Sequence, residues 1–581
     1  MNTRILRSLI ATAIAATALG CNLDVENPND PDVNRALSDP GGLERLISGA
    51  FQTWATTRGD YFSALPMTTQ ADNYTASWNN AAIRFYNSVG SDCPERCAWT
   101  NSATAPEAAG GPTVEFSYYG YYTVLSAAND VLAAIGRGVC FDGNFTADDC
   151  AADNTLTSRN TAISKMLQGM ALAGIAMFYD QGFVVDETTD LTAVLTAPFN
   201  TRVEIRDAAL AKFDEAFTEA GLHAWDTDPT WMGIGGLGYS NTQIQRLIRT
   251  MQAELLAMFP RNDTENAAAD WAQVATFAAA GISSGTPFDW EYTIDPANVC
   301  GIDCVKTWGN SILTMRVDTR VASKITNHTH PWPEPAGNAC PTGAGIYGQD
   351  DRVGDGSYGP EDDYNGAATV MATANAGTDF ACSGVAIFPA ARGQYHQSNL
   401  QHVRYHHLAY EGEGLPGENG SGQDPFYTRQ MNDLLWAEAE IRRAGGSGAV
   451  AAARINNSRN GRGGLPNLTG AETQAQLLNA LWYEQDIEFM GQGATPFFNR
   501  RRRAPYCTNP CIGAEGLING TPRHMPVPDK ELQVLLRANY TFGGAGNPAG
   551  MLVSGSSRPS VRDRFEELKR VRRGELLKGR L

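Results

Sequence analysis

The segment ISKMLQGMALAGIAMF occupies residues 163–178 and carries the clearest periodicity in the chain. Its apolar and small residues recur three or four positions apart. These positions are Ile163, Met166, Leu167, Met170, Gly174 and Phe178. Residues at this spacing lie on one face of an α-helix, so the segment predicts a helix that packs against neighbours.

The same spacing recurs on both sides of this segment. The further predicted helices span Leu43–Thr56, Tyr118–Ile135, Arg206–Ala220, Thr242–Phe259, Ala267–Ile282, Met431–Arg443 and Gln474–Phe489. Asp207 and Thr473 lie near predicted helix starts, and Gly221 lies near a predicted end. Residues 286–425 are rich in Gly, Asp, Asn, Pro and Thr, and they predict loops with short strands. The predicted fold class is mainly α, with helical hairpins on either side of an irregular insert.

Composition limits the classes of function. The chain has 581 residues, of which 43% are hydrophobic and 19% charged, as is typical of a globular protein. Its 45 Lys and Arg against 63 Asp and Glu give a net charge of −18. A broad nucleic-acid surface needs clustered cations, so no nucleic-acid partner is expected.

The amino terminus has the pattern of an export signal. Arg4 and Arg7 precede the apolar run Leu9–Leu19, which is too short to span a bilayer as a helix. The sequence ALGC at residues 18–21 resembles a bacterial lipobox, although Ala18 stands where Leu is usual. It implies that Cys21 is lipidated and becomes the first residue of the mature protein. An ordinary secretory signal is the alternative.

Ten cysteines remain when Cys21 is set aside. In an exported protein they predict local disulfides, which we expect to join Cys93–Cys97, Cys140–Cys150, Cys300–Cys304 and Cys507–Cys511. Cys340–Cys382 is the pairing left by elimination. Metal binding is the alternative, but no C-x₂-C pair or H-x₃₋₅-H pair completes a zinc set.

Several segments, taken in order, resemble the SusD/RagB family of outer-membrane nutrient-binding lipoproteins. They are Asp39–Phe51, Tyr121–Leu132, Tyr427–Ala439, Ile455–Pro466 and Glu484–Arg501, followed by Met525–Leu532. The fourth resembles the family pattern "IN.iR.RAGLP" and the fifth "ERR.EL..EG…F..RR". Asp351-Arg352 resembles the family's "D.R" loop motif. Gln485, Gln492 and Thr495 replace the usual Arg, Glu and Arg, which implies a rearranged buried ionic network.

The resemblance implies tetratricopeptide-type helical hairpins with a loop-rich cap. It also implies a lipid-anchored protein at the surface of the outer membrane. Such a protein covers a TonB-dependent outer-membrane transporter (SusC-like) and captures an oligosaccharide or a peptide. The predicted organisation is a signal peptide (1–20), a tether (21–38), an N-terminal helical region (39–285), the insert or cap (286–425), a C-terminal helical region (426–545) and a basic extension (546–581).

The sequence holds little that predicts catalysis. It contains no H-E-x-x-H, no G-x-S-x-G and no phosphate-binding loop that ends in G-K-S/T. GIGGLG at residues 233–238 fits G-x-G-x-x-G, but no strand is predicted before it, which favours a loop. No enzyme activity is therefore expected. A secreted glycan-degrading enzyme that uses a carboxylate pair is one alternative, and a structural or adhesive surface protein is another.

No cofactor or metal is expected. His396, His402, His406 and His407 are predicted to be polar surface groups. The alternative is a metal site in which His402 and His406 share a helix face. Calcium is a possible ligand of an acidic loop, which a solvated role explains better. That loop contains Asp350, Asp351, Asp355 and Glu361–Asp363.

Tryptophans in predicted loops are the candidate ligand contacts. These are Trp78, Trp99, Trp225, Trp231, Trp308 and Trp332. Flat aromatic faces flanked by hydrogen-bonding side chains suit sugar rings. The preferred cluster is Asp72, Asn73 and Tyr74 with Trp78, and Trp231 and Trp332 rank next. Packing of the cap onto the helices is the alternative for each of them.

The carboxyl terminus is basic. Ser556–Leu581 carries nine Lys and Arg against four acidic residues. A solvated tail is predicted, and the alternative is a helix that contacts anionic lipid head groups or an acidic partner surface.

Overall fold

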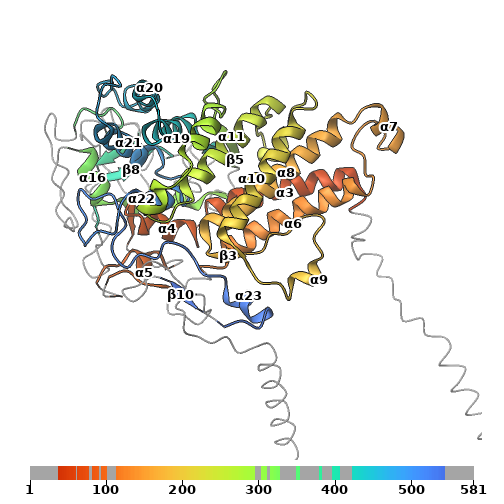
Figure 1. The fold of residues 1–581 in the computed structure, drawn as a ribbon, viewed down its shortest axis with the longest axis horizontal. Helices are drawn as coiled ribbons and strands as arrows, with labels where there is room; N and C mark the ends of the chain where they lie inside the picture. Colours follow the sequence, from red (N-terminus) through yellow and green to blue (C-terminus); the bar gives the residue numbers. More distant parts are fainter. Residues whose placement is uncertain are drawn as a thin grey trace, which may run out of the picture.

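A computed structural model of the chain describes residues 37–60, 62–76, 82–90, 93, 95–100, 113–294, 302–309, 315–326, 348–353, 379–382, 396–398, 400–405, 422–538 and 540–542. Its long helices pack side by side in a row (Figure 1). They are α3 (Pro40–Arg58), α6 (Phe116–Gly136), α8 (Thr155–Phe178), α10 (Arg202–Ala220), α11 (Asn241–Met258), α13 (Trp271–Ala279), α19 (Arg429–Arg442), α20 (Gly448–Arg459) and α21 (Gln474–Glu488). Each predicted helix is present, so the mainly α fold class is confirmed.

Side-chain caps decide where the helices begin. α10 starts directly after Thr201, whose hydroxyl accepts from the backbone of Glu204 while the Glu204 carboxylate accepts from the backbone of Thr201. The predicted start near Asp207 is therefore wrong, because Asp207 lies inside the helix. Thr473 caps α21 in the same reciprocal way, and Gly221 is the C-cap of α10; both predictions are confirmed.

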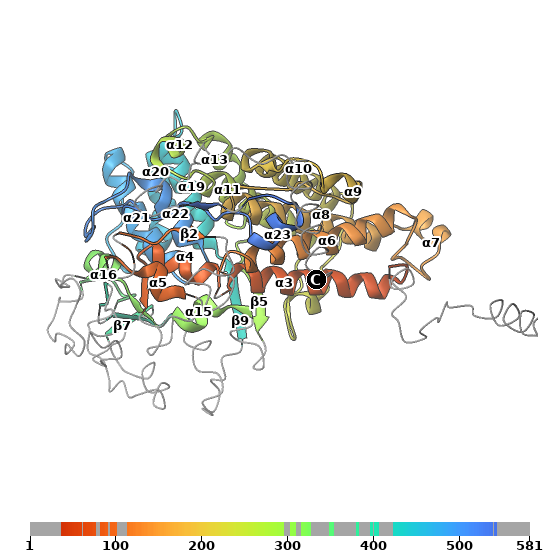
Figure 2. The same ribbon diagram turned by 90° about the horizontal axis from the view of Figure 1, so that it is seen from below.

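The described residues of the insert form short antiparallel ladders and short helices, set below the row of helices in Figure 2. The ladders join β1 (Tyr74–Ala76) to β6 (Met315–Val317), β5 (Trp290–Ile294) to β9 (Gly422–Tyr427), and β7 (Phe380–Cys382) to β8 (Leu400–His402). The short helices include α15 (Cys304–Gly309) and α16 (Thr319–Ile325). Trp308 lies in α15, and Trp99 lies in β2 (Trp99–Thr100), which pairs with β10 (Thr541–Phe542); the prediction of loops at these two tryptophans is wrong.

α8 lies among α3, α6 and α10 and packs most extensively against α10 and α6. Among the described residues it is the helix long and apolar enough to cross a membrane, since it has 24 residues and contains an 18-residue stretch with a mean hydropathy of 1.3. Within the protein, 89% of that apolar stretch is buried, so here α8 is the core helix of the bundle.

A polar stripe runs along α8. Asn160, Ser164 and Gln168 are spaced four residues apart and are all fully buried. The Gln168 amide donates to Asn129 Oδ1 and to Glu187 Oε2, both at 2.7 Å. Hydrogen bonding of this kind offsets the cost of burying an amide and fixes how α8 is rotated against α6.

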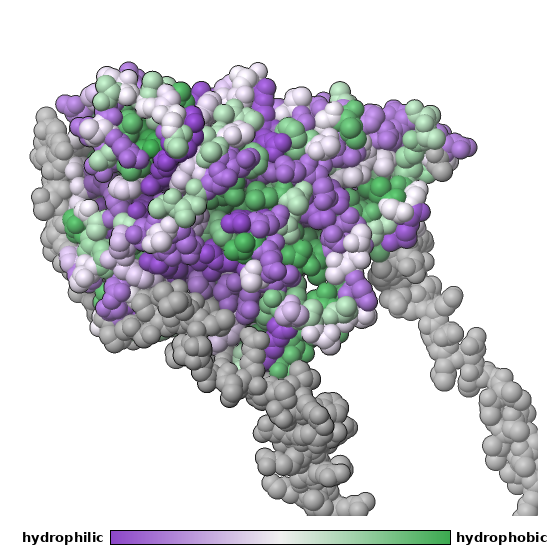
Figure 3. All heavy atoms as spheres, in the orientation of Figure 1, coloured by the Kyte–Doolittle hydropathy of each residue, from purple (hydrophilic) through white to green (hydrophobic). Residues whose placement is uncertain are grey.

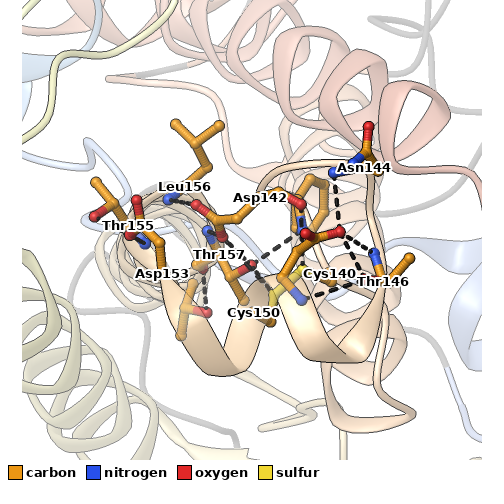
Figure 4. The surroundings of a disulfide bond; sticks show 12 residues. Cys140, Asp142, Asn144, Thr146, Cys150, Asp153, Thr155, Leu156 and Thr157 are labelled. Atoms are coloured by element: carbon orange, nitrogen blue, oxygen red, sulfur yellow. Dashed lines mark hydrogen bonds between the residues drawn. A yellow bond between two sulfur atoms is a disulfide. The ribbon is translucent and has the colours of Figure 1, made fainter.

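The N-terminus of α8 is capped from a distant loop (Figure 4). The Asp142 carboxylate accepts from the backbone of Leu156 at 2.7 Å and of Thr157 at 3.0 Å, and from the Thr157 hydroxyl at 2.7 Å. The disulfide Cys140–Cys150 closes the loop that carries Asp142. A carboxylate at this position satisfies unpaired N–H groups and interacts favourably with the helix dipole.

The other end of α8 is capped by an arginine of α22 (Thr495–Arg503). Arg501 donates to the carbonyl oxygens of Met177 at 3.0 Å, Met258 at 3.1 Å and Pro260 at 3.3 Å. These carbonyls belong to the C-terminal ends of α8 and α11, which otherwise lack helical partners. One buried guanidinium therefore joins the ends of two core helices.

We expect Asp142→Ala to lower the free energy of unfolding by about 1 kcal/mol, because it removes the cap of the central helix. Denaturant unfolding followed by circular dichroism measures the change. Asp148→Ala is the control, because Asp148 is exposed on α7 (Ala147–Ala152) and does not cap α8. An equal loss in both variants would contradict the capping role.

Candidate ligand-binding groove

The predicted cluster at Asp72 lies in the interior. Asp72 Oδ2 is 2.7 Å from Arg320 Nη1, its Oδ1 forms an ion pair with Arg96, and it lies 3.4 Å from His396 Nδ1. Burial acts to raise the pKa of Asp72, but the charges of Arg96 and Arg320 outweigh it and hold the pKa below its usual value. Asp72 is therefore a charged structural anchor between β1 and α16.

Tyr74 is also buried, on β1. Its hydroxyl is 2.6 Å from His402 Nδ1. His402 lies on β8, so the alternative of a helical metal site with His406 is wrong for His402; His406 and His407 lie outside the described residues. Burial lowers the pKa of His402 well below its usual value, which keeps the imidazole neutral.

Trp231 packs inside the protein rather than on its surface. It lies in η3 (Pro229–Met232), is 2% exposed, stacks on Phe51 with ring centroids 6.4 Å apart and lies under the Arg159 guanidinium at 4.8 Å. The 3-10 helix η3, not a strand, precedes GIGGLG, which confirms that this motif is a loop. Trp78 and Trp332 lie outside the described residues.

Ligand contact by Asp72, Asn73, Tyr74 and Trp231 stays a prediction. All four side chains are at most 2% exposed, and for Asp72, Tyr74 and Trp231 the partners are protein groups. Sequence context suggested exposed loops because polar residues flank these positions, whereas tertiary contacts bury them.

The predicted local disulfides are present wherever both cysteines are described. Cys93–Cys97, Cys140–Cys150 and Cys507–Cys511 are bonded. Cys304 is disulfide-bonded, and its predicted partner Cys300 lies outside the described residues, as do Cys340 and Cys21. The Cys340–Cys382 pairing and the lipidation of Cys21 therefore stay predictions.

Two groups of described residues bring three potential metal ligands together. One is Cys140, Asp142 and Cys150; the other is Asp72, Asp318 and His396. The two sulfurs of the first group form a disulfide, and Asp142 caps α8. The second group faces Arg96 and Arg320, whose charges oppose a cation. The interactions of both groups are therefore accounted for by structural roles.

The acidic loop is predicted to be solvated, which is wrong for Asp350, because Asp350 is buried in an ion pair. Asp350 accepts from Arg352 Nε at 2.9 Å and from Nη2 at 2.8 Å, while Asp351 is exposed. Asp355 and Glu361–Asp363 lie outside the described residues.

An open groove follows the contact between α3 and α6, and we call it the α3–α6 groove. Its main cavity measures about 430 Å³. The lining residues are Gln52, Thr53, Thr56, Thr57, Glu115, Phe116, Tyr119, Gly120 and Thr123. A second cavity of about 400 Å³ shares Tyr119 and Thr123 and continues along α6 to Asp130. The volume is within the range of small-ligand sites.

The close approach of the two helices forms the floor of the groove. A Cβ atom added to Gly120 would lie 2.2 Å from Thr57 Oγ1, so a larger residue could not occupy this crossing. Thr53, Thr57 and Thr123 donate their hydroxyl protons to the carbonyls four residues earlier in their own helices. Their hydroxyl oxygens can therefore accept a further hydrogen bond but have no proton left to donate.

Phe116 and Tyr119 supply the aromatic surface of the groove, and Tyr119 is the more exposed of the two. The Tyr119 side chain is 37% exposed, and partial burial together with nearby Glu531 and Glu115 raises its pKa to about 12. The phenol therefore stays protonated at neutral pH. An aromatic face beside methyl groups and acceptor oxygens suits a ligand that has C–H faces and hydroxyl donors. Sequence analysis missed this site because Tyr119 and the threonines occur within helices, where periodicity points to packing.

Three motifs of the family resemblance converge in the interior, away from the groove. Arg352 Nη1 is 2.6 Å from Glu484 Oε2, 2.9 Å from Ser458 Oγ and 3.4 Å from Glu488 Oε1. Ser458 lies on α20, and both glutamates lie on α21. We call Arg352, Asp350, Ser458, Glu484 and Glu488 the Arg352 cluster. All five are buried, so these motifs hold the insert to the C-terminal helices.

A second buried cluster contains one of the departures from the family pattern. Glu438 is joined to Arg502 through two bonds of 2.8 and 2.6 Å, and to Arg442 at 2.7 Å. Gln485, which stands in place of the usual Arg, donates to Glu438 Oε2 at 3.0 Å. The amide keeps a hydrogen bond in the cluster without adding a third positive charge.

No protein-family model matches the sequence, and no curated protein matches it. Solved structures do match over most of the chain. A SusD superfamily protein from Parabacteroides distasonis superimposes with a TM-score of 0.55 and 11% identity, over 85% of this chain and 97% of that one. A SusD superfamily protein from Bacteroides fragilis gives a TM-score of 0.51 and 13% identity, over 86% and 98%. The chain therefore has the SusD fold.

Proposed function

We propose that the protein is a non-catalytic, lipid-anchored nutrient-binding subunit on the outer membrane. It captures an oligosaccharide and delivers it to a TonB-dependent transporter. The observation that carries the proposal is the SusD fold over nearly the full length of two solved superfamily members. The export signal and the lipobox-like ALGC at residues 18–21 support the location.

The α3–α6 groove favours a glycan over a charged peptide. Its polar surface consists mainly of threonine oxygens, the Gln52 amide and the Tyr119 phenol. Glu115 is the one acidic side chain in the main cavity, and it is paired with Lys530 Nζ at 2.6 Å. A neutral ligand with many hydroxyl groups matches this lining better than a zwitterionic one.

Titration calorimetry of the mature protein against a panel of oligosaccharides tests the proposal. We expect Tyr119→Ala to weaken binding about tenfold, because it removes the stacking face. Phe145→Ala is the matched control, since Phe145 is 57% exposed on the loop before α7 and lies outside the groove. Loss of binding in Trp78→Ala with full binding in Tyr119→Ala would place the ligand at the predicted Trp78 cluster instead.

Purification from the native membrane tests the transporter partnership. We expect a large outer-membrane barrel to co-purify with the protein. Absence of both the barrel and any glycan binding would refute the proposal. Turnover of a polysaccharide by the isolated chain would favour the enzyme alternative.

A further inference from the structure

Four large aliphatic side chains are exposed on two short segments far apart in the sequence. Leu191 and Leu195 lie at α9 (Leu191–Val194) and are 65% and 58% exposed. Val534 and Leu536 lie at the end of α23 (Asp529–Val534) and are 68% and 39% exposed. We call these four residues the aliphatic patch. Aliphatic surface that gathers in one place marks an interaction site more often than single exposed side chains do.

The two segments are held together by one arginine. Arg537 Nη2 donates to the carbonyl oxygen of Ala197 at 2.6 Å, and its guanidinium lies 4.1 Å from the centre of the Phe199 ring. α9 and α23 lie near each other in both ribbon views (Figures 1 and 2), and Figure 3 shows apolar atoms over α23 at the lower edge of the molecule. The patch is therefore a fixed feature of the fold.

The carboxyl-terminal segment starts beside this patch. Tyr540, four residues after Leu536, accepts from the Gln181 amide at 2.9 Å and lies 3.1 Å from Asp180 Oδ1. The described chain ends two residues later, in β10. Residues 543–555 are rich in Gly, and a Gly-rich chain of this length has a typical reach of about 20 Å. The segment beyond Gly555 can therefore fold back onto the patch.

The sequence of that segment predicts an amphipathic helix. Val561, Phe565, Leu568 and Val571 are spaced four and three residues apart and share one helix face. The other faces carry most of the nine Lys and Arg of Ser556–Leu581. A helix with one apolar stripe and a basic exterior is complementary to an apolar surface with acidic surroundings.

Acidic side chains lie on both segments of the aliphatic patch. Asp190 is exposed and caps α9, and Glu531 lies half-buried on α23, while the exposed Lys530 of α23 is paired with Glu115. The geometry points to one occupant: we propose that the carboxyl-terminal segment docks on the aliphatic patch of its own chain as an amphipathic helix. Its apolar stripe covers the four aliphatic side chains, and its basic residues face the acidic rim.

A peptide of residues 556–581, labelled with a fluorophore and added to the protein truncated after Gly555, tests the proposal by anisotropy. We expect saturable binding that weakens as salt rises, because the rim contacts are exposed ion pairs. Leu191→Asp and Val534→Asp should each weaken binding at least tenfold. Ile234→Asp is the matched control and should leave binding unchanged, since Ile234 is 77% exposed on the GIGGLG loop.

Hydrogen exchange provides a second readout in the uncut mature chain. Amides of α9 and α23 should exchange more slowly there than in the truncated protein. Equal exchange in the two proteins, or peptide binding that the patch variants do not alter, would overturn the proposal. Binding of the peptide to phosphatidylglycerol vesicles but not to the truncated protein would also overturn it and would assign the segment to a lipid surface.

Discussion

Arg352→Met is expected to lower the free energy of unfolding by about 3–5 kcal/mol. The Arg352 guanidinium is fully buried and bonds to Asp350 and Glu484, with Glu488 at 3.4 Å. Methionine keeps much of the aliphatic stem but leaves Asp350 and Glu484 without their nearest positive charge, while Glu488 keeps its pairs with Arg404 and Arg462. The loss therefore exceeds that of an ordinary salt bridge, since an uncompensated buried charge is costly.

Denaturant unfolding at neutral pH measures this loss through the midpoint and the slope of the transition. Arg429→Met is the matched control, because Arg429 is 47% exposed and its pair with Asp289 is 3.4 Å long. Exposed pairs of this kind contribute less than about 1 kcal/mol. If Arg352→Met lowered the free energy of unfolding no more than Arg429→Met does, the Arg352 cluster would not be what joins the insert to α20 and α21.

Glu438→Gln is expected to cost a similar amount, about 3–5 kcal/mol, because it leaves Arg502 buried without its carboxylate. Burial acts to raise the pKa of Glu438, but the charges of Arg502 and Arg442 hold it well below the usual value. A carboxyl group whose pKa is lower in the folded chain stabilises the fold above its unfolded pKa of about 4.5. That contribution is lost as the pH falls below this value.

Unfolding curves recorded between pH 7 and pH 3 test both parts of this prediction. The native chain should lose stability steeply below about pH 4.5, and Glu438→Gln should show a shallower decline from a lower starting point. Glu215→Gln serves as the control, because Glu215 is 46% exposed and its pairs with Lys165 and Lys212 lie near solvent. A parallel pH profile in Glu438→Gln and the native chain would show that Glu438 does not titrate as predicted.

The helices were predictable because periodicity is a local property. Leu167 and Met170 repeat at helical spacing whatever their partners are, and α8 is present where this pattern predicts it. The start of α10 at Thr201 was missed although its capping box is also local, because the apolar periodicity begins further on. Helices with a clear apolar periodicity could thus be predicted from the sequence.

The candidate site was harder to predict because burial of loop residues depends on distant partners. Asp72 resembles a loop acid in its sequence context, yet Arg320, 248 residues away, lies against it. Arg352 and Glu488 resemble family motifs without any indication that they meet. Tyr119 lies in a predicted helix, and its exposure depends on how closely Gly120 lets α3 approach. Such long-range pairings are set by tertiary packing.

The polar stripe of α8 has a consequence for the export that we propose for this protein. An apolar segment of this length can move laterally out of a translocation channel into the bilayer. The rest of an exported chain would then not be released from the membrane. Asn160, Ser164 and Gln168 make that transfer costly, because amide and hydroxyl groups find no water in hydrocarbon. The side chains that orient α8 in the bundle would thus also keep the nascent chain moving through the membrane.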